Sequence, residues 1–311
     1  MNNQTINEKI DDFFHLQWLR AENVPWDLHV CKIFQKYFVN NKFSKNLEVG
    51  VGNGLNTFIN LNGKLNKSFD FFLNAKTDNF FKNADIYDHK LKLESTFGNK
   101  IIKKNSENKF HLVLDYKKNL VDISRLLNIS KNYKVFDCNN SFKKFEKFDF
   151  IYSSIIYWLN NPYDRIIKIL KLLNYKGSFL FTIPNQNYLE YCKSYTLKGR
   201  LWNLINRGRK KTLKCTVSEN IFEKWLQKNK INIAAKHYLL SEKTLKIWDI
   251  GLRPVSPFLI KMANKMNFID RSKIKEDWCN NLMPIVKELS HEELIYGKKK
   301  GGYCMYLLEL K

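Results

Sequence analysis

The sequence predicts an α/β fold with a mostly parallel sheet, and two observations carry this prediction. Short apolar segments typical of strands alternate with amphipathic segments typical of helices along most of the 311 residues. One expected strand, at 46–51, runs directly into a loop with Gly50, Gly52 and Gly54. Glycine has no Cβ and accepts a positive φ, so such a loop lets a ligand lie against bare backbone. We therefore expect a ligand-binding loop at the carboxyl edge of the sheet.

The remaining elements follow from periodicity and capping residues. Residues 1–40 are expected to be helical, with a break at Pro25, because apolar residues recur there at helical spacing. The expected strands are short apolar runs: 46–51, Phe110–Asp115, Tyr133–Asp137, Phe148–Ser154, Ser178–Ile183, Ile231–Leu240 and Tyr303–Leu310. The expected helices have an apolar stripe or a capping residue: 56–61, Asn119–Leu127, Pro162–Leu173, 218–227 and 241–296. Segment 62–108 has little periodicity and is expected to be an insertion with short helical pieces.

The composition is that of a globular protein, with 44% hydrophobic and 27% charged residues. No apolar run is long enough to cross a bilayer, and the first residues lack the basic-then-apolar pattern of a signal peptide. We therefore expect a cytoplasmic protein with no transmembrane segment. The six cysteines form no C-x-x-C pair and the histidines have no ligand spacing, so no metal site is expected.

The net charge of +23 has two readings. It can mark a protein that binds nucleic acid or an anionic membrane surface. It can also reflect AT-rich coding, because Lys, Asn, Ile, Phe and Tyr are plentiful while arginine is scarce. We favour the second reading, since a surface that binds phosphates is expected to use more arginine. The one dense basic run, Lys198–Lys214, can lie over an acidic substrate or form a solvated helix and loop.

The spacing of the glycines narrows the ligand. A dinucleotide fingerprint, G-x-G-x-x-G, needs glycine at the position of Leu55, whereas this chain has G-x-G-x-G. That difference points from NAD towards S-adenosylmethionine (SAM). Each of the next three expected strands ends in side chains that suit such a ligand. These are Asp115, then Asp137 with Cys138, and then Ser153 with Ser154, which Tyr157 and Trp158 follow. Asp115 can accept hydrogen bonds from both hydroxyls of a ribose. Both aspartates can instead cap helices, and the two aromatic residues can belong to the core.

At this point the chain resembles a class I SAM-dependent methyltransferase. Leu47–Gly54 is similar to the first motif of that family, and the block from Phe148 to Gly177 is similar to its fourth and fifth strand region. The resemblance spans roughly residues 45–240 and the final strand. It implies a Rossmann-like three-layer sandwich with a seven-stranded sheet whose last strand is antiparallel, and it implies SAM as the methyl donor.

The resemblance also implies roles for individual residues. Glu48 and the loop from Gly50 to Gly54, with Gly52 and Asn53, would border the methionine and ribose parts of SAM. Asp115 would hold the ribose, and Ser153 and Ser154 would lie beneath the methionine part, while the adenine would lie against Asp137 and Cys138. The segment between Gly54 and Asp115 is longer than is usual in the family, which leaves Asp70 and Asp78 as alternatives for the ribose acid.

The methyl acceptor is expected to bind outside the core. We expect an N-terminal helical cap at 1–45, a SAM-binding core at 46–240 with an insertion at about 62–108, a helical insertion at 241–300 that covers the acceptor, and a final core strand at 301–311. Tyr157, Trp158 and His29 are candidates on the acceptor side. The stretch Ser153–Ile156 stands where amide and adenine N-methylating enzymes have [ND]-P-P-[YFW], which disfavours those classes.

We expect a small-molecule or sugar-type acceptor, and the sequence leaves the general base and the oligomeric state open. One alternative is a nucleic-acid methyltransferase that binds RNA through the basic surface. The other is a methyltransferase-like scaffold without activity.

Overall fold

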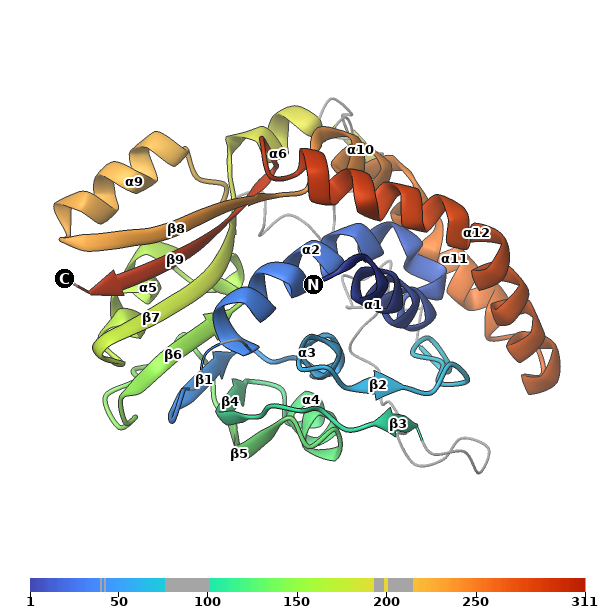
Figure 1. Cartoon of the computed structure of the whole chain (residues 1–311), viewed down its shortest axis with the longest axis horizontal. Coiled ribbons are helices and arrows are strands. Elements are labelled where there is room, and N and C mark those ends of the chain that lie inside the picture. The colour runs from blue at the N-terminus through green and yellow to red at the C-terminus, as the bar shows by residue number, and fades with distance from the viewer. Residues whose placement is uncertain (40, 42, 76–100, 193–198, 201–214, 311) are drawn as a thin grey trace.

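In the computed structural model of the chain, one large sheet lies between two groups of helices (Figure 1). The structure describes residues 1–39, 41, 43–75, 101–192, 199–200 and 215–310. The strands of the sheet are β1 Asn46–Val49, β4 Phe110–Asp115, β5 Ser130–Val135, β6 Phe148–Ser153, β7 Leu173–Pro184, β8 Ile231–Leu239 and β9 Tyr303–Leu310. Their order across the sheet is β5-β4-β1-β6-β7-β9-β8. The seven-stranded α/β fold that the sequence predicted is confirmed.

The direction and order of the strands indicate at which edge of the sheet a ligand can bind. β9 pairs in antiparallel fashion with both β7 and β8, so the other six strands run the same way. From β1 the chain passes first to β4 and β5 on one side and then to β6 and β7 on the other. The strand order therefore reverses beside β1, and in open α/β sheets this reversal opens a crevice at the carboxyl ends of the strands. The glycine loop follows β1 at this edge.

Helices connect the strands of the sheet. Helices from the two ends of the chain also pack together over one face of the sheet. They are α1 Asn3–Leu16, α2 Val24–Phe34, α3 Leu55–Asn60, α4 Lys118–Leu126, α5 Pro162–Leu170, α6 Gln186–Tyr191, α9 Glu219–Lys228, α10 Glu242–Ile250, α11 Leu252–Ala263 and α12 Phe268–Tyr296. Three shorter pieces are the 3₁₀ helices Trp18–Asn23 and Ile156–Trp158 and the π-helix Gln35–Val39. Asn161 caps α5 by accepting from the amide of Asp164, with Pro162 in the first turn, as the sequence predicted.

Two hydrophobic cores lie on the two faces of the sheet. Leu47 and Val49 of β1 belong to the core that α5 and α9 cover. Glu48, between them, points to the opposite face, where it contacts Thr57 of α3. That second face is covered by α1, α2 and α3, and α12 packs along α1 and α2 although it follows them by more than two hundred residues (Figure 1). A carboxylate from the interior strand β1 is therefore buried beneath the N-terminal helices.

Several predicted element bounds were wrong, and the largest differences concern α5, β7 and β5. The helix expected to reach Leu173 ends at Leu170, and β7 begins at Leu173 instead of Ser178. The reason is a bulge, because the register of β6 and β7 shifts between Phe148 and Phe150 and so takes the residues before Gly177 into the strand. The strand expected at Tyr133–Asp137 runs from Ser130 to Val135.

Segment 62–108 holds a two-stranded antiparallel ribbon, β2 Lys64–Leu65 with β3 Ile102–Lys104, where short helical pieces were expected. Residues 76–100 between these strands, with Asp78, lie outside the described residues. The proposed division into cap, core and helical insertion stays a prediction. Within the described ranges, no helix combines the length and the apolar character needed to span a membrane.

Candidate functional site

The glycine loop is left-handed at every second residue. The φ angles of Gly50, Gly52 and Gly54 are 82°, 58° and 75°, a region that other residues enter only with strain. The loop is fixed to the neighbouring strand, because the amides of Gly50 and Val51 donate to the carbonyl oxygen of Leu114 at 2.8 and 3.0 Å. The glycines and these hydrogen bonds therefore fix the conformation of the loop.

The three glycines differ in what surrounds them. A Cβ on Gly50 would meet the side chain of Ile155, and a Cβ on Gly54 would meet Ile129 and Ser124. A Cβ on Gly52 would meet no atom of the described residues within 4 Å. Gly52 is therefore the point of the loop at which another molecule can lie against the backbone.

Asp115 closes β4 and faces this point. Its Oδ2 accepts a hydrogen bond from the amide of Gly52 at 2.9 Å, and its Oδ1 accepts one from the amide of Lys117 at 3.0 Å. Burial raises the pKa of the carboxyl, while these amide hydrogen bonds act in the opposite direction. The structure thus brings Asp115 and the glycine loop together, and the role of Asp115 as the acid that binds a ribose stays a prediction.

Glu48 lies under the start of α3 and is 2% exposed. One oxygen accepts from the hydroxyl of Thr57 at 2.8 Å, and Oε2 has no hydrogen-bond partner in the described part of the chain. Burial raises the pKa of Glu48 to about 8, and the nearby carboxyl of Asp115 adds to the rise. A buried carboxylate with an unpaired oxygen is costly, and a cationic group beside it would remove that cost.

Asn53, Ser153 and Ser154 each form a hydrogen bond within the loop or between neighbouring strands. The side chain of Asn53 accepts from the amide of Leu55 at 3.0 Å and so supports the first turn of α3. The hydroxyl of Ser153 donates to the carbonyl of Val49 at 2.9 Å and joins β1 to β6. The carbonyl of Ser154 accepts from the hydroxyl of Thr182 at 3.4 Å. These contacts hold the loop in place, and a role of these residues in binding a cofactor stays a prediction.

Asp137 and Cys138 follow β5 on the far side of Asp115. Asp137 is exposed and accepts from the amide of Asn139 at 2.9 Å. Cys138 is buried, which raises the pKa of its thiol to about 12, and the carboxyls of Asp115 and Asp137 add to that rise. The two acids and the thiol thus lie near one another, and the thiol stays neutral at physiological pH.

The three candidates on the acceptor side lie in different settings. Trp158 is 41% exposed, while Tyr157 is half-buried with its ring 5.6 Å from that of Tyr303. His29 is buried, and its Nδ1 lies 2.9 Å from a carboxylate oxygen of Glu293 in α12. The role of His29 towards an acceptor stays a prediction; in the structure it joins α2 to α12.

Sequence reasoning missed Asp27 in α2. Its side chain is buried, and Oδ1 accepts from the amide group of Asn56, in the first turn of α3, at 3.1 Å. Burial raises the pKa of Asp27 to about 7, against an opposing effect of Arg20. Acidic residues are common in the first turn of a helix, because a negative charge there interacts favourably with the helix dipole. Nothing in the sequence therefore indicated that Asp27 is buried.

The structure assigns a different role to one alternative for the ribose acid. Asp70 pairs with Arg271 of α12 at 2.7 Å and accepts from the indole nitrogen of Trp18 at 3.0 Å. Asp70 therefore connects α12 to the segment that contains Trp18.

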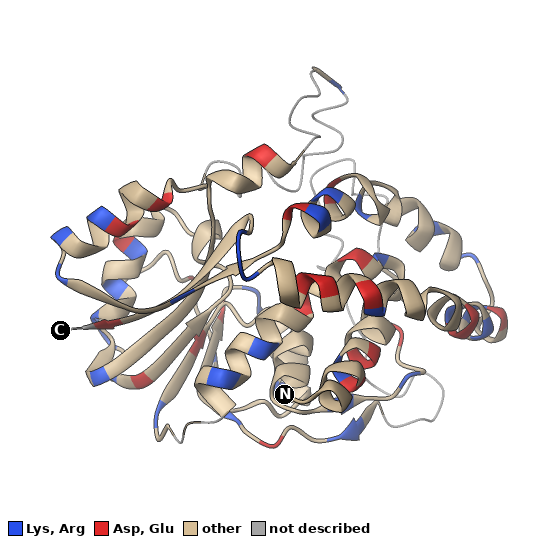
Figure 2. Ribbon diagram, turned by 45° about the horizontal axis from the view of Figure 1, so that its top comes forward, with Lys and Arg blue, Asp and Glu red and all other residues tan. Residues whose placement is uncertain are grey.

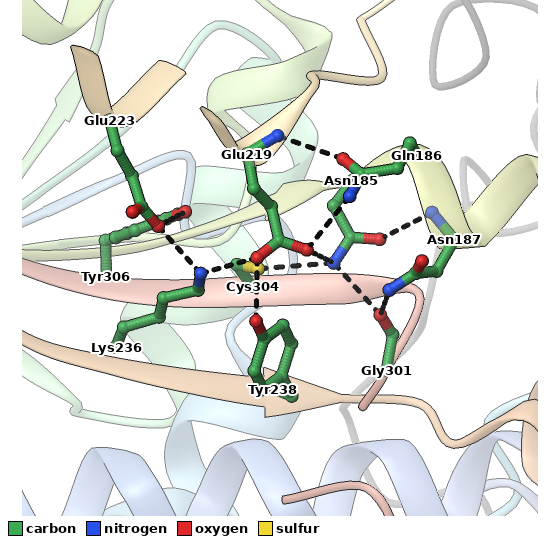
Figure 3. A network of polar contacts seen from close by, with 10 residues as sticks. All are labelled: Asn185, Gln186, Asn187, Glu219, Glu223, Lys236, Tyr238, Gly301, Cys304 and Tyr306. Carbon is green, nitrogen blue, oxygen red and sulfur yellow. Dashed lines mark hydrogen bonds and ion pairs between the residues drawn. The ribbon is translucent and has the colours of Figure 1, made fainter. Parts of the chain in front are cut away.

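A polar network lies where β7 ends, near α9 and the start of β9 (Figure 3). The side chain of Asn185 donates to Glu219 at 3.0 Å and to the carbonyl of Gly301 at 2.9 Å. Lys236 of β8 pairs with Glu219 at 2.5 Å and with Glu223 at 2.7 Å. These interactions tie β7, β8 and β9 to α9 and hold the carboxyl end of β7 in position.

Charged residues, coloured on the ribbon, are distributed over the helices on both sides of the sheet (Figure 2). Of the basic run Lys198–Lys214, only residues 199 and 200 belong to the described part. Among the described residues, no group of three or more His, Cys, Asp or Glu side chains is placed to hold a metal ion.

No protein-family model matches the sequence, and no curated protein matches it. Solved structures are similar to this chain at low identity. The plantazolicin methyltransferase BpumL in complex with SAH is 11% identical, with 99% of this chain and 90% of that chain covered and a TM-score of 0.44. A SAM-dependent methyltransferase from Thiobacillus denitrificans in complex with S-adenosyl-L-homocysteine is 10% identical, with 96% and 98% covered and a TM-score of 0.48. The [4+2]-cyclase SpnF is 11% identical, with 90% and 80% covered and a TM-score of 0.44.

Proposed function

We propose that this protein is a methyltransferase that transfers a methyl group from SAM to a small-molecule acceptor. The observation that carries the proposal is the open backbone at Gly52, held in a left-handed turn next to the carboxylate of Asp115. A glycine that only shaped the turn would not need open space in the direction of its missing Cβ. An acid held beside that space supplies the hydrogen-bond acceptor that a ribose needs.

The residues around this point fit the parts of SAM. Asp115 would accept from the ribose hydroxyls, and Gly52 would border the ribose and methionine parts. The unpaired oxygen of Glu48 would face the positively charged end of the molecule, and the adenine would lie towards Asp137 and Cys138. When bound, SAM supplies an electrophilic methyl group on a sulfonium.

The protein's own contribution is to orient the two reactants and to exclude water from them. Aligning two reacting centres in one site can supply much of the acceleration of such a displacement, and a dry site adds to it. The helices at the two ends of the chain cover the same face of the sheet as Glu48. We propose that this cover encloses the acceptor, with Tyr157 and Trp158 on the acceptor side.

Calorimetric titration of the protein with S-adenosylhomocysteine, the product that remains after methyl transfer, tests the proposal. We expect saturable binding with one site per chain, and competition between this product and SAM. No heat and no thermal shift with either compound would refute the proposed function.

Asp115→Asn is expected to weaken binding of S-adenosylhomocysteine by about 10- to 100-fold, because hydrogen bonds to a charged group contribute roughly 1.5–3 kcal/mol. The asparagine keeps one oxygen for the amide of Gly52 but loses the one that accepts from the amide of Lys117, so the melting temperature of the variant is measured beside its affinity. Titration calorimetry measures the effect, and Asp122→Asn on the exposed side of α4 is the matched control. Equal affinity in both variants would show that Asp115 serves the loop alone.

Binding of SAM is expected to release a proton. Glu48 is largely protonated below its pKa of about 8, because it is buried and the neighbouring carboxyl of Asp115 disfavours its charged form. A cationic ligand favours the carboxylate, so the affinity should rise with pH from 6.0 to 7.5, by up to about tenfold per pH unit. Calorimetry in two buffers of different ionisation enthalpy counts the proton, and Glu48→Gln should remove this part of the release. An unchanged proton count in that variant would contradict the role of Glu48.

A further inference from the structure

A tight turn, residues 137–140, follows β5 beside the strand that ends in Asp115. The amide of Phe136 donates to the carbonyl oxygen of Asp115 at 2.8 Å, so β4 and β5 stay joined up to the start of the turn. The turn is closed by the amide of Asn140, which donates to the carbonyl oxygen of Asp137 at 2.8 Å. The 137–140 turn therefore lies at the edge of the sheet at which we place the adenine of SAM.

Two consecutive residues of the turn offer hydrogen-bonding groups to a ligand. Oδ1 of Asp137 accepts from the amide and the side-chain nitrogen of Asn139, at 2.9 and 3.0 Å, while Oδ2 accepts from no described residue. The side chain of Cys138 is buried in the core, and its backbone amide donates to nothing in the described part of the chain. The turn thus presents an acceptor next to a donor. Adenine has the complementary pair on its Watson–Crick edge, because its 6-amino group donates and N1 accepts.

Arg165, in α5, holds this turn in place. Its Nη1 donates to the carbonyl oxygen of Asn140 at 3.0 Å and, more weakly, to that of Cys138 at 3.5 Å. Its Nε donates to the carbonyl oxygen of Asn160 at 3.4 Å, and the amide of Asn160 donates to Oδ1 of Asn139 at 2.8 Å. The planar guanidinium has several donors in a fixed arrangement, so one side chain can bind two separate segments at once. The turn is therefore fixed to the segment that leads into α5.

The same segment also contacts the glycine loop. It follows β6, and Ile155 near its start lies so close to Gly50 that a Cβ on that glycine would meet the Ile155 side chain. β1 and β4 lie between β5 and β6 in the sheet (Figure 1). The chain from Ile155 to Arg165 therefore reaches past the ends of both strands and connects the glycine loop with the 137–140 turn. A substitution of Arg165 changes what holds the turn and removes none of the groups that we expect to touch SAM.

We propose that Arg165 is a positioning residue for the adenine of SAM, so that the selectivity of the site for adenine depends on it. This inference rests on the proposed function and names a specificity determinant of the same site. Oδ2 of Asp137 and the amide of Cys138 can pair with one base only when the backbone of the turn has the right orientation, because hydrogen bonds weaken steeply with misalignment. Without Arg165 the turn keeps its own hydrogen bonds but loses its direct link to α5.

A pair of ligands that differ only in the base tests the proposal: S-adenosylhomocysteine and S-inosylhomocysteine. In the inosyl compound a carbonyl replaces the 6-amino group and N1 carries a hydrogen, so both hydrogen-bonding groups are reversed. In titration calorimetry the unmodified protein should bind the adenosyl compound at least about 30-fold more tightly, because mismatched polar groups are left unpaired in the site.

The variants of Arg165 should lower this ratio of affinities. In Arg165→Ala we expect the affinity for the adenosyl compound to fall about tenfold and that for the inosyl compound by less than about threefold, since only the adenosyl compound pairs with the turn. Arg165→Lys should give an intermediate ratio, because an ammonium keeps the charge but lacks the planar fork. Arg125→Ala is the matched control, since Arg125 forms an exposed ion pair with Asp122 in α4 at 3.0 Å, and it should leave the ratio unchanged.

Each outcome supports or overturns the inference. An equal loss of affinity for both compounds in Arg165→Ala, or no loss, overturns it and leaves the SAM site intact, because Arg165 would then not act on the base. Equal affinity of the unmodified protein for the two compounds also overturns it. Failure of the unmodified protein to bind either compound refutes the proposed function itself. Asn139→Ala is a second variant in case Arg165→Ala does not fold: it removes the bond from the amide of Asn160, and an unchanged ratio in it would overturn the inference as well.

Discussion

Gly52→Val is expected to reduce the affinity for SAM and S-adenosylhomocysteine by at least about 100-fold. A side chain at this position points into space that no described residue occupies within 4 Å, the space in which we place the ligand. The bulky residue would also disturb the hydrogen bond from its own amide to Asp115. Because the ligand cannot shift without losing its other contacts, the loss should exceed that of removing one hydrogen bond. Titration calorimetry with both compounds measures it.

Backbone strain has to be separated from loss of the site. The φ of Gly52 is +58°, and a left-handed residue with a side chain costs roughly 1–2 kcal/mol. Gly199→Val is the matched control, because Gly199 has a φ of +66° and a Cβ there would likewise meet no described atom within 4 Å. Both variants should lose similar stability in thermal unfolding, but Gly52→Val alone should lose binding. Normal affinity in Gly52→Val would show that the ligand lies elsewhere.

The features that could be predicted from the sequence are local ones. Alternating apolar segments indicated the strands of the sheet, and the three glycines with Leu55 marked the loop, because backbone conformation depends on adjacent residues. The closeness of Asp115 to the glycine loop could be predicted, because the carboxyl ends of parallel strands meet at one edge of the sheet. The bulge at the start of β7 could not, because it depends on how Phe148 and Phe150 pair with a distant segment.

The contacts of α2 with the rest of the protein join residues far apart in the sequence, so sequence reasoning missed them. His29 meets Glu293 across 264 positions of sequence, and Trp26 meets Tyr303 across a similar separation. Asp27 looked like an ordinary acid of a first helical turn, and only the packing of α2 against α3 and the sheet buries it. Periodicity reports which face of a helix is apolar, but it does not report what covers a polar residue. The glycine loop could therefore be predicted from the sequence, while the long-range contacts of Trp26, Asp27 and His29 required the structure.

Arg271→Ala is expected to lower the free energy of unfolding by about 3–5 kcal/mol, which corresponds to a fall in melting temperature of about 5–8 °C for a chain of this length. The guanidinium of Arg271 is 2% exposed and donates to Asp70 at 2.7 Å and to Asn264 at 2.9 Å. Asp70 also accepts from the indole of Trp18 and from the amide of Phe72. Removing the cation leaves a buried carboxylate without its charged partner, and this is the costly half of breaking a buried pair.

The same pair predicts how stability depends on pH. Burial raises the pKa of Asp70, but its hydrogen bond and charge interaction with Arg271 outweigh that effect and lower the pKa below 3.8. The contribution of the pair is therefore present above pH 3.8 and is lost as the pH falls through the lower pKa of the folded state. Thermal unfolding from pH 3 to pH 7 should show a loss of stability towards low pH that is smaller in Asp70→Asn, and a double-mutant cycle with Arg271→Ala should give a coupling energy above about 1 kcal/mol. Lys118→Ala, at an exposed ion pair with Asp122, should change stability by less than about 0.5 kcal/mol under the same conditions. Additive effects of the two substitutions would show that Asp70 and Arg271 act independently of each other.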